Sequence, residues 1–147
     1  MSPNTPNLKT AEELFQQGFE RYKAGESAKD LIPVFQEITE RQPKVASGWI
    51  CLSWLYLLED QAPLAVKAAQ KAVKLSPEDP QGRINLAIAL LETKQPGVRE
   101  QVEAAENWLL LMSDLKAEIE ANFGDGLRRR PDWPALTKVR SWLFETA

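Results

Sequence analysis

With 147 residues, 44% of them hydrophobic and 27% charged, the chain is long enough to fold as one domain with a sizeable core. Its net charge of −3 does not predict that the whole surface attracts nucleic acid or an anionic membrane. The sequence has no histidine and one cysteine, Cys51, which excludes an internal disulfide, metal sites built on several cysteines and histidine-based catalytic dyads or triads.

The first ten residues, MSPNTPNLKT, are polar and rich in proline, and they lack the apolar run of a signal peptide. The apolar runs further along the chain are too short to span a bilayer. We therefore expect a flexible N-terminus over residues 1–11 and a soluble, cytoplasmic protein without membrane insertion.

A period of 34 residues links apolar, small and proline positions. Residues of matching character lie 34 positions apart: Phe15 and Trp49, Tyr22 and Tyr56, Leu31 and Ala65, Phe35 and Ala69, Pro43 and Pro77, Leu52 and Leu86, and Ser53 and Ala87. Because so many positions share one offset, the chain is predicted to contain repeats.

The central repeat predicts a hairpin of two helices. Ser47 can cap a first helix that runs to about Leu58, and Pro63 suits the first turn of a second helix, where its missing N–H costs little. Small alanines on one face of the second helix let the two helices approach closely. Pro77 and Pro80 then end the hairpin.

This central stretch resembles the tetratricopeptide repeat (TPR), which shows a large residue, Leu, a small residue and Tyr, and later Ala, an aromatic or small residue, Ala and Pro. The residues at these places are Trp49, Leu52, Ser53, Tyr56, Ala65, Ala69, Ala72 and Pro77. The first repeat, about residues 12–45, matches less closely. There Gly18 and Phe19 stand where the family has Leu and a small residue.

The third repeat begins at Pro80 and keeps Leu86, Ala87 and Leu90. Its second helix diverges, since extra residues around KQPGVREQV are needed to reach the family's later Ala, aromatic and Ala places. With that insertion the three places are expected to fall on Ala104, Trp108 and Leu111.

Apolar residues continue at spacings of three and four from Val98 to Phe123, which predicts either one long helix over about 98–122 or two helices with a break near Ser113. The GDG at 124–126 is expected to end this helical stretch. A linker and a last helix from about Asp132 to Phe144 are expected to follow. The expected fold is all-α: TPR-like helical repeats over 12–123, and a linker with a C-terminal capping helix over 124–147.

The resemblance implies that the first helices of successive repeats line a concave groove. The residues expected to face it are Gln16, Glu20, Lys23, Ile50, Trp54, Leu57, Leu58, Ile84, Ile88 and Leu91. This groove would be polar at one end and apolar in the middle. Its occupant is a helix or peptide of a partner, the chain's own C-terminal helices, or a second copy of the chain.

One basic cluster, Arg128, Arg129 and Arg130, is a secondary candidate contact for an anionic partner or for nucleic acid. The alternative is a solvated linker whose arginines pair with acidic helices.

The function predicted from the sequence is a non-catalytic interaction scaffold or adaptor, in concrete form an assembly factor, that needs no cofactor or metal. Its partner is another protein, and no nucleic acid is expected. A C-terminal basic contact with an anionic partner, or a structural homodimer formed through the groove, are the alternatives.

Overall fold

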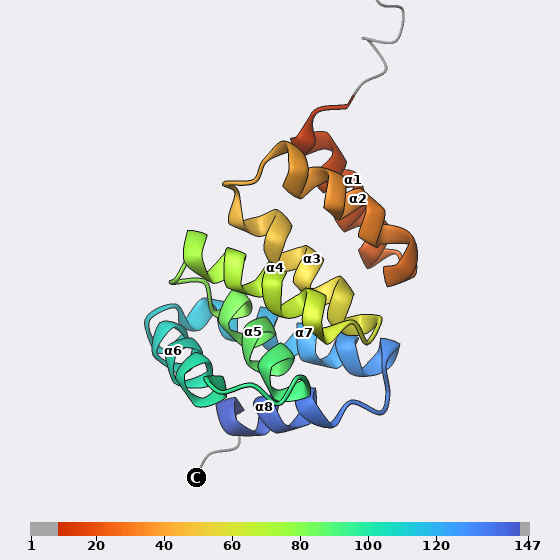
Figure 1. Cartoon of the computed structure of the whole chain (residues 1–147). Helices are drawn as coiled ribbons and strands as arrows, with labels where there is room; N and C mark the ends of the chain where they lie inside the picture. Colours follow the sequence, from red (N-terminus) through yellow and green to blue (C-terminus); the bar gives the residue numbers. More distant parts are fainter. Residues whose placement is uncertain (1–8, 145–147) are drawn as a thin grey trace, which may run out of the picture.

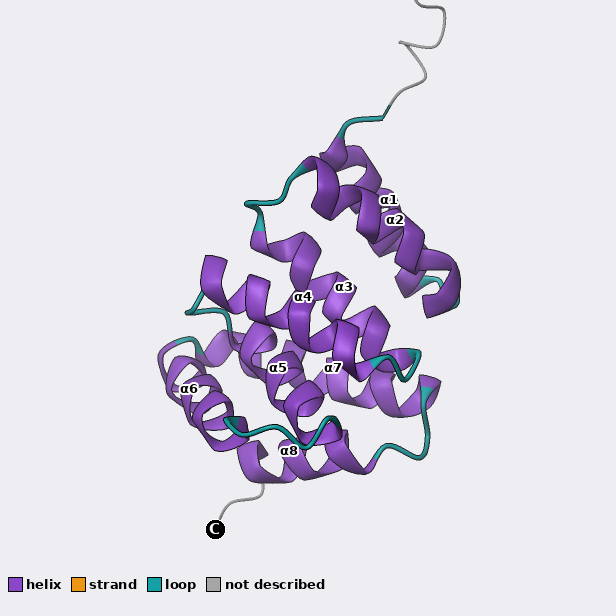
Figure 2. Cartoon of the chain, in the orientation of Figure 1, coloured by secondary structure: helices purple, strands orange, loops and turns teal. Residues whose placement is uncertain are grey.

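The computed structural model describes residues 9–144, which form eight α-helices and one short 3-10 helix and contain no strand (Figures 1 and 2). The elements are α1 (Ala11–Lys23), α2 (Ala28–Arg41), α3 (Ala46–Leu58), α4 (Ala62–Leu75), α5 (Pro80–Glu92), α6 (Val98–Leu111), η2 (Ser113–Leu115), α7 (Lys116–Arg129) and α8 (Pro134–Phe144). The all-helical prediction is confirmed. Most of the expected flexible N-terminus, residues 1–8, lies outside the described residues.

The helices pair as three hairpins that stack in chain order. α1 packs on α2, α3 on α4 and α5 on α6, while α2 meets α3 and α4 meets α5 across the hairpin boundaries. After the third hairpin, α8 packs on both α5 and α6, where a further repeat would otherwise stack (Figure 1). A helix at this place covers the apolar side that the last hairpin of a solenoid would expose.

α3 begins slightly earlier than the sequence predicts. The residue that caps it is Val45, without a side-chain hydrogen bond, and Ser47 is already helical. Gly48 lies so close to α2 that an added Cβ would come within 3.1 Å of Ile38 and 3.3 Å of Thr39. Packing against α2, rather than a polar cap, therefore defines this end of α3.

The small and apolar positions shared with the TPR pattern form the core. Leu52, Ser53, Ala65, Ala69, Ala72 and Ala87 are all buried. Every residue of α3 from Leu52 to Leu58 is buried as well, so this helix is covered on all sides.

The predicted register of the third repeat is wrong in its second helix. The residues of α6 that enter the core are Val102, Ala105 and Leu109, which lie 37 positions after Ala65, Ala68 and Ala72. The insertion between the repeats is thus three residues long, and Leu111 is left exposed. Gly97 adopts a left-handed conformation directly before α6, so the lengthened turn sets where this helix begins.

The stretch from residue 98 to residue 122 contains two helices, because α6 ends at Leu111 and α7 begins at Lys116. The prediction that GDG ends the second of these helices is wrong, since α7 continues to Arg129. A Cβ added to Gly126 would stand 2.9 Å from side-chain atoms of both Trp54 and Leu136. This glycine serves close packing within a helix rather than a stop.

Candidate functional site

α7 crosses the face formed by the first helices of the three hairpins, α1, α3 and α5. Asp125 of α7 accepts a hydrogen bond from the Tyr22 hydroxyl of α1, and Gly126 packs against Trp54 of α3. Asn122 donates to Gln81 Oε1 of α5 at 2.9 Å. A single C-terminal helix thus reaches all three helices that were expected to line the groove.

Arg129 fastens this helix to the end of α1. Its guanidinium donates to the backbone carbonyls of Tyr22, at 2.6 Å, and Glu26, at 2.8 Å, and it lies 4.0 Å from the centre of the Tyr22 ring. A third donor, Nε, reaches Asp125 at 3.1 Å. Carbonyls at the C-terminal end of a helix lack partners within the helix and carry partial negative charge, so an arginine stabilises them.

Arg130 makes the equivalent contact with α3. It donates to the Leu57 carbonyl at 2.7 Å and forms ion pairs with Glu92 at 2.9 Å and with Asp60 at 3.2 Å. The indole of Trp133 donates to the same Glu92 oxygen at 3.0 Å. The other Glu92 oxygen, Oε1, is buried without a hydrogen-bond partner among the described residues.

The three arginines predicted as a secondary contact therefore differ in accessibility. Arg129 and Arg130 are largely buried and bound to carbonyls of their own chain, whereas the Arg128 side chain is 72% exposed and pairs with Asp125 at 3.0 Å.

The hydrogen bonds around Tyr22 shift two pKa values. Burial, together with the bond to Asp125, raises the pKa of the Tyr22 hydroxyl well above its ordinary value, so it stays protonated. Burial by itself raises the pKa of Asp125, but the Tyr22 hydrogen bond and the charge of Arg129 outweigh it, and the net pKa is lowered. Asp125 is thus ionised at neutral pH. The same Tyr22 oxygen accepts from the Trp54 indole at 2.8 Å.

The predicted groove residues fall into three groups. Trp54, Leu57, Leu58, Ile84 and Ile88 are at most 9% exposed and share one buried cluster with C-terminal residues such as Phe123 and Trp133. The partly exposed residues are Ile50 and Leu91, and the exposed ones are Gln16, Glu20 and Lys23. The chain's own C-terminal part therefore covers the apolar middle of the groove and leaves the end near α1 accessible.

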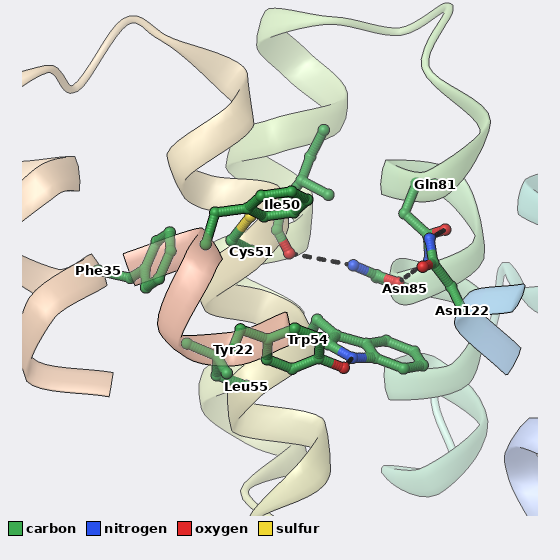
Figure 3. A pocket seen from close by; sticks show the side chains of 10 residues that line it. Tyr22, Phe35, Ile50, Cys51, Trp54, Leu55, Gln81, Asn85 and Asn122 are labelled. Carbon is green, nitrogen blue, oxygen red and sulfur yellow. Dashed lines mark hydrogen bonds between the residues drawn. The ribbon is translucent and has the colours of Figure 1, made fainter. Parts of the chain in front are cut away.

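At that end a pocket of ≈ 90 Å³ remains between α1, α3, α5 and α7 (Figure 3). Phe19, Ile50 and Trp54 supply apolar surface, and Gln81 and Asn122 supply amide groups. The remaining lining residues are Tyr22, Phe35, Cys51, Leu55 and Asn85.

A network of amides forms one wall of this pocket. Asn85 is fully buried, donating to the Ile50 carbonyl at 3.1 Å and to Ser53 at 3.0 Å, and accepting from Gln81 at 2.8 Å. Gln81 in turn accepts from Asn122. The network holds α3, α5 and α7 at fixed spacing, and it leaves Asn85 no free donor for a ligand.

Sequence reasoning missed Phe19, Gln81 and Asn122 as pocket residues, although one signal was present. Phe19 is one of the two residues at which the first repeat departs from the TPR pattern. A Cβ on its neighbour Gly18 would stand 2.8 Å from the Phe35 ring. The small residue therefore packs against α2, while Phe19 turns to the groove and is 37% exposed.

Cys51 also lines the pocket, but it is unsuited to nucleophilic chemistry. Burial raises the pKa of its thiol to about 12, so the reactive thiolate is scarce at neutral pH. Within residues 9–144 no group of three His, Cys, Asp or Glu side chains could hold a metal ion. None of the helices described is long and apolar enough to cross a membrane.

Comparison with solved structures identifies the fold. The TPR2B domain of yeast Sti1, solved as a complex with pHsp70, gives a TM-score of 0.64 at 20% identity, over 82% of this chain and 98% of that one. The type III secretion translocator chaperone SycD of Yersinia enterocolitica gives 0.66 at 16% identity, over 82% and 92%. SycD in complex with a peptide of the translocator YopD gives 0.53 at 18% identity, over 90% and 88%.

No protein-family model and no curated protein matches the sequence. The structural likeness shows that the chain has the TPR-like fold of stacked helical hairpins that its sequence resembles.

Proposed function

We propose that this protein is a non-catalytic adaptor that binds an extended peptide segment of a partner protein at the open end of its concave groove. The observation that carries this proposal is the pocket beside Phe19, Ile50 and Trp54, which remains open although α7 covers the rest of the groove. SycD, which has the same fold, was solved with a peptide of its translocator, and this supports the choice of ligand.

The size of the pocket favours an extended segment over a helix. A helix with its side chains is about 10 Å across, whereas ≈ 90 Å³ accommodates an apolar side chain of a chain passing over it. The exposed row of Gln16, Glu20 and Lys23 along α1 would face the polar groups of that segment. An assembly factor that holds one protein for transfer to another is the concrete form of this role.

The residues around the pocket do not favour a ligand with a C-terminal carboxylate. Among the residues that line the pocket and the exposed row of α1 beside it, Lys23 is the one cation, and its ammonium lies 4.7 Å from the centre of the Phe19 ring. Gln16 is engaged with Glu20 at 3.0 Å, and Asn85 is fully bonded inside the core. We therefore expect the partner segment to be internal and to be recognised through an apolar side chain.

The experiment is a selection from a displayed library of random linear peptides on the wild-type protein, followed by fluorescence anisotropy of the enriched peptides. Ile50→Glu places a charge in the pocket wall and is expected to weaken binding at least about tenfold, because a buried apolar contact is worth about 1.5–3 kcal/mol. Leu64→Glu, an exposed position on α4, is the matched control and is expected to leave binding unchanged.

Circular dichroism must show both variants folded. The proposal fails if the selection enriches no peptide, or if enriched peptides bind Ile50→Glu as tightly as they bind the wild type.

A further inference from the structure

A second apolar surface lies on α6, on the side of that helix that the core does not use. Leu110 and Leu111 are 80% and 75% exposed, the highest values among the large exposed hydrophobic residues in the described part of the chain. Ala104 and Trp108 are partly exposed and precede Leu111 by seven and three positions, so the three share one helical face. Leu110 lies about 100° further around the helix, next to Leu111. We call Ala104, Trp108, Leu110 and Leu111 the α6 stripe.

The α6 stripe is not an extension of the core. The core-facing residues of this helix, Val102, Ala105 and Leu109, are already buried. With that face buried against its neighbours, α6 needs no further apolar surface, and it has a second apolar face. Exposed leucines in adjacent positions are unfavourable in water unless something covers them, and patches of this kind mark interaction surfaces.

Acidic residues border the α6 stripe. Within α6, Glu103 and Glu106 precede Leu110 by seven and four positions and Glu100 precedes Ala104 by four, and Asp114 follows in η2, just after the helix ends. None of these four carboxylates forms an ion pair within residues 9–144. Between Arg99 and Glu118 the chain carries five acidic and two basic residues.

From this combination we propose that the α6 stripe docks a basic amphipathic helix of a partner protein. Apolar side chains of the partner would cover Trp108, Leu110 and Leu111, and its lysines or arginines would pair with the acidic border. The contact lies outside the concave groove and does not depend on peptide binding there.

Charge decides against the other occupants. A symmetric contact between two copies of this chain would bring the two acidic borders together, which costs free energy. The basic face of α4, with Lys67, Lys71 and Lys74, offers a single exposed leucine, Leu64, and so lacks an apolar stripe to meet this one. Nucleic acid and anionic lipid carry the same sign of charge as the border.

The test uses two synthetic 18-residue amphipathic helices with identical leucine stripes, one with lysine and one with glutamate on the polar face. Binding to the full chain is measured by fluorescence anisotropy at two salt concentrations. We expect saturable binding of the Leu/Lys peptide, no saturable binding of the Leu/Glu peptide, and weaker binding at the higher salt concentration.

Two double variants and one single-variant control locate the site. Leu110→Gln with Leu111→Gln is expected to weaken binding of the Leu/Lys peptide at least about tenfold, because each leucine loses apolar contact. Leu64→Gln, on α4, is the matched control and is expected to bind like the wild type. Glu103→Gln with Glu106→Gln leaves the leucines intact and is expected to weaken binding severalfold and to reduce its dependence on salt.

The proposal is overturned if the Leu/Lys peptide does not bind, if the Leu/Glu peptide binds equally well, or if both double variants bind like the wild type. Sedimentation of the protein alone tests the second-copy alternative. If the wild type forms a dimer and the leucine double variant does not, the α6 stripe binds a second copy of this chain, and the proposed basic partner is wrong. Ile50→Glu is expected to bind the Leu/Lys peptide normally, which separates this surface from the groove.

Discussion

Gly126 shows how a single missing side chain places α7 against the rest of the molecule. A Cβ added to this residue would stand 2.9 Å from the ring of Trp54 and 2.9 Å from the side chain of Leu136. Trp54 is itself held by its hydrogen bond to Tyr22 and packs on Trp133 with 5.5 Å between ring centres. Since these rings have little freedom to move, only glycine fits at this contact.

We predict that Gly126→Ala lowers the free energy of unfolding by about 1–3 kcal/mol, as overpacking of a well-packed core does. Gly124→Ala is the control in the same helix, because its Cβ would meet only the Arg128 guanidinium at 3.7 Å. That control is expected to be neutral or to stabilise by up to about 1 kcal/mol through helix propensity. Urea unfolding measures both, and equal effects at the two glycines would contradict the packing argument.

The second prediction at the residue scale concerns the ion pair between Arg130 and Glu92. Arg130→Met removes the guanidinium and leaves the Trp133 indole as the remaining hydrogen-bond partner of Glu92 Oε2. The other oxygen, Oε1, has no hydrogen-bond partner among the described residues even in the wild type. We expect a loss of about 2–4 kcal/mol in urea unfolding, because a mostly buried charge loses its pair. Arg128→Met, at an exposed arginine, should cost less than about 1 kcal/mol.

The double variant Arg130→Met with Glu92→Gln separates charge from packing. It should be more stable than Arg130→Met alone, because no uncompensated carboxylate is left. A double variant that loses the sum of both single effects would show that the two residues do not interact.

At the scale of elements, α7 is attached by polar contacts as well as by a small number of buried residues. Its buried residues are Ile119, Phe123 and Gly126, and the rest of its attachment is made by Asn122, Asp125 and Arg129. Such an attachment should respond to pH, because Asp125 takes part in it as an anion.

The pKa of Asp125 is lowered in the folded chain, so ionised Asp125 contributes stability that is complete above its unfolded value of about 3.8. That contribution is lost as the pH falls from about 4 through the folded pKa. We predict that hydrogen exchange of the α7 amides, corrected for the intrinsic effect of pH, becomes faster in this range than exchange in α4. In Asp125→Asn the α7 amides should exchange faster at neutral pH, and their exchange should no longer accelerate in acid. If the pH profile of this variant is unchanged, the acid dependence belongs to another group.

How far the sequence predicts these elements depends on the kind of signal each one carries. The 34-residue period specifies the first two hairpins and the start of the third, because core positions must recur where identical units stack. The period could not give the register of α6, since a three-residue insertion in a turn leaves no mark on helical spacing. It placed Leu111 in the core, where the structure has Leu109.

The path of α7 was beyond local reasoning for a different reason. Two glycines within three residues are typical of a helix end, but here they stand within a helix, and the reason is a contact with Trp54, 72 positions earlier in the chain. The same limit applies to the site. The sequence predicts which helix faces line the groove, while the residues that α7 covers depend on tertiary packing.

In the whole molecule, α7 changes how the solenoid holds together. In a simple solenoid each repeat touches its neighbours alone, so stability is a sum of local terms and the ends can unfold separately. Here α7 and the residues after it join α1, α3 and α5 through Tyr22, Leu57 and Gln81, which are far apart in sequence. These contacts oppose the separate unfolding of the first hairpin.

We therefore predict that urea unfolds the wild type in one transition, with tryptophan fluorescence and far-UV circular dichroism coinciding. The five tryptophans lie in the second hairpin and beyond, and Trp54 is bonded to Tyr22 of α1, so most of the fluorescence change reports on the later hairpins and a smaller part on α1. Arg129→Gln removes the bonds that tie α7 to the carbonyls of Tyr22 in α1 and Glu26 in the turn after it, and in this variant ellipticity should begin to fall at lower urea than the main fluorescence change. Arg128→Gln, which leaves those carbonyls bound, should keep the two transitions together. Separate transitions in the wild type would mean that the first hairpin unfolds independently of α7, and the linkage through Arg129 would then contribute nothing to cooperativity.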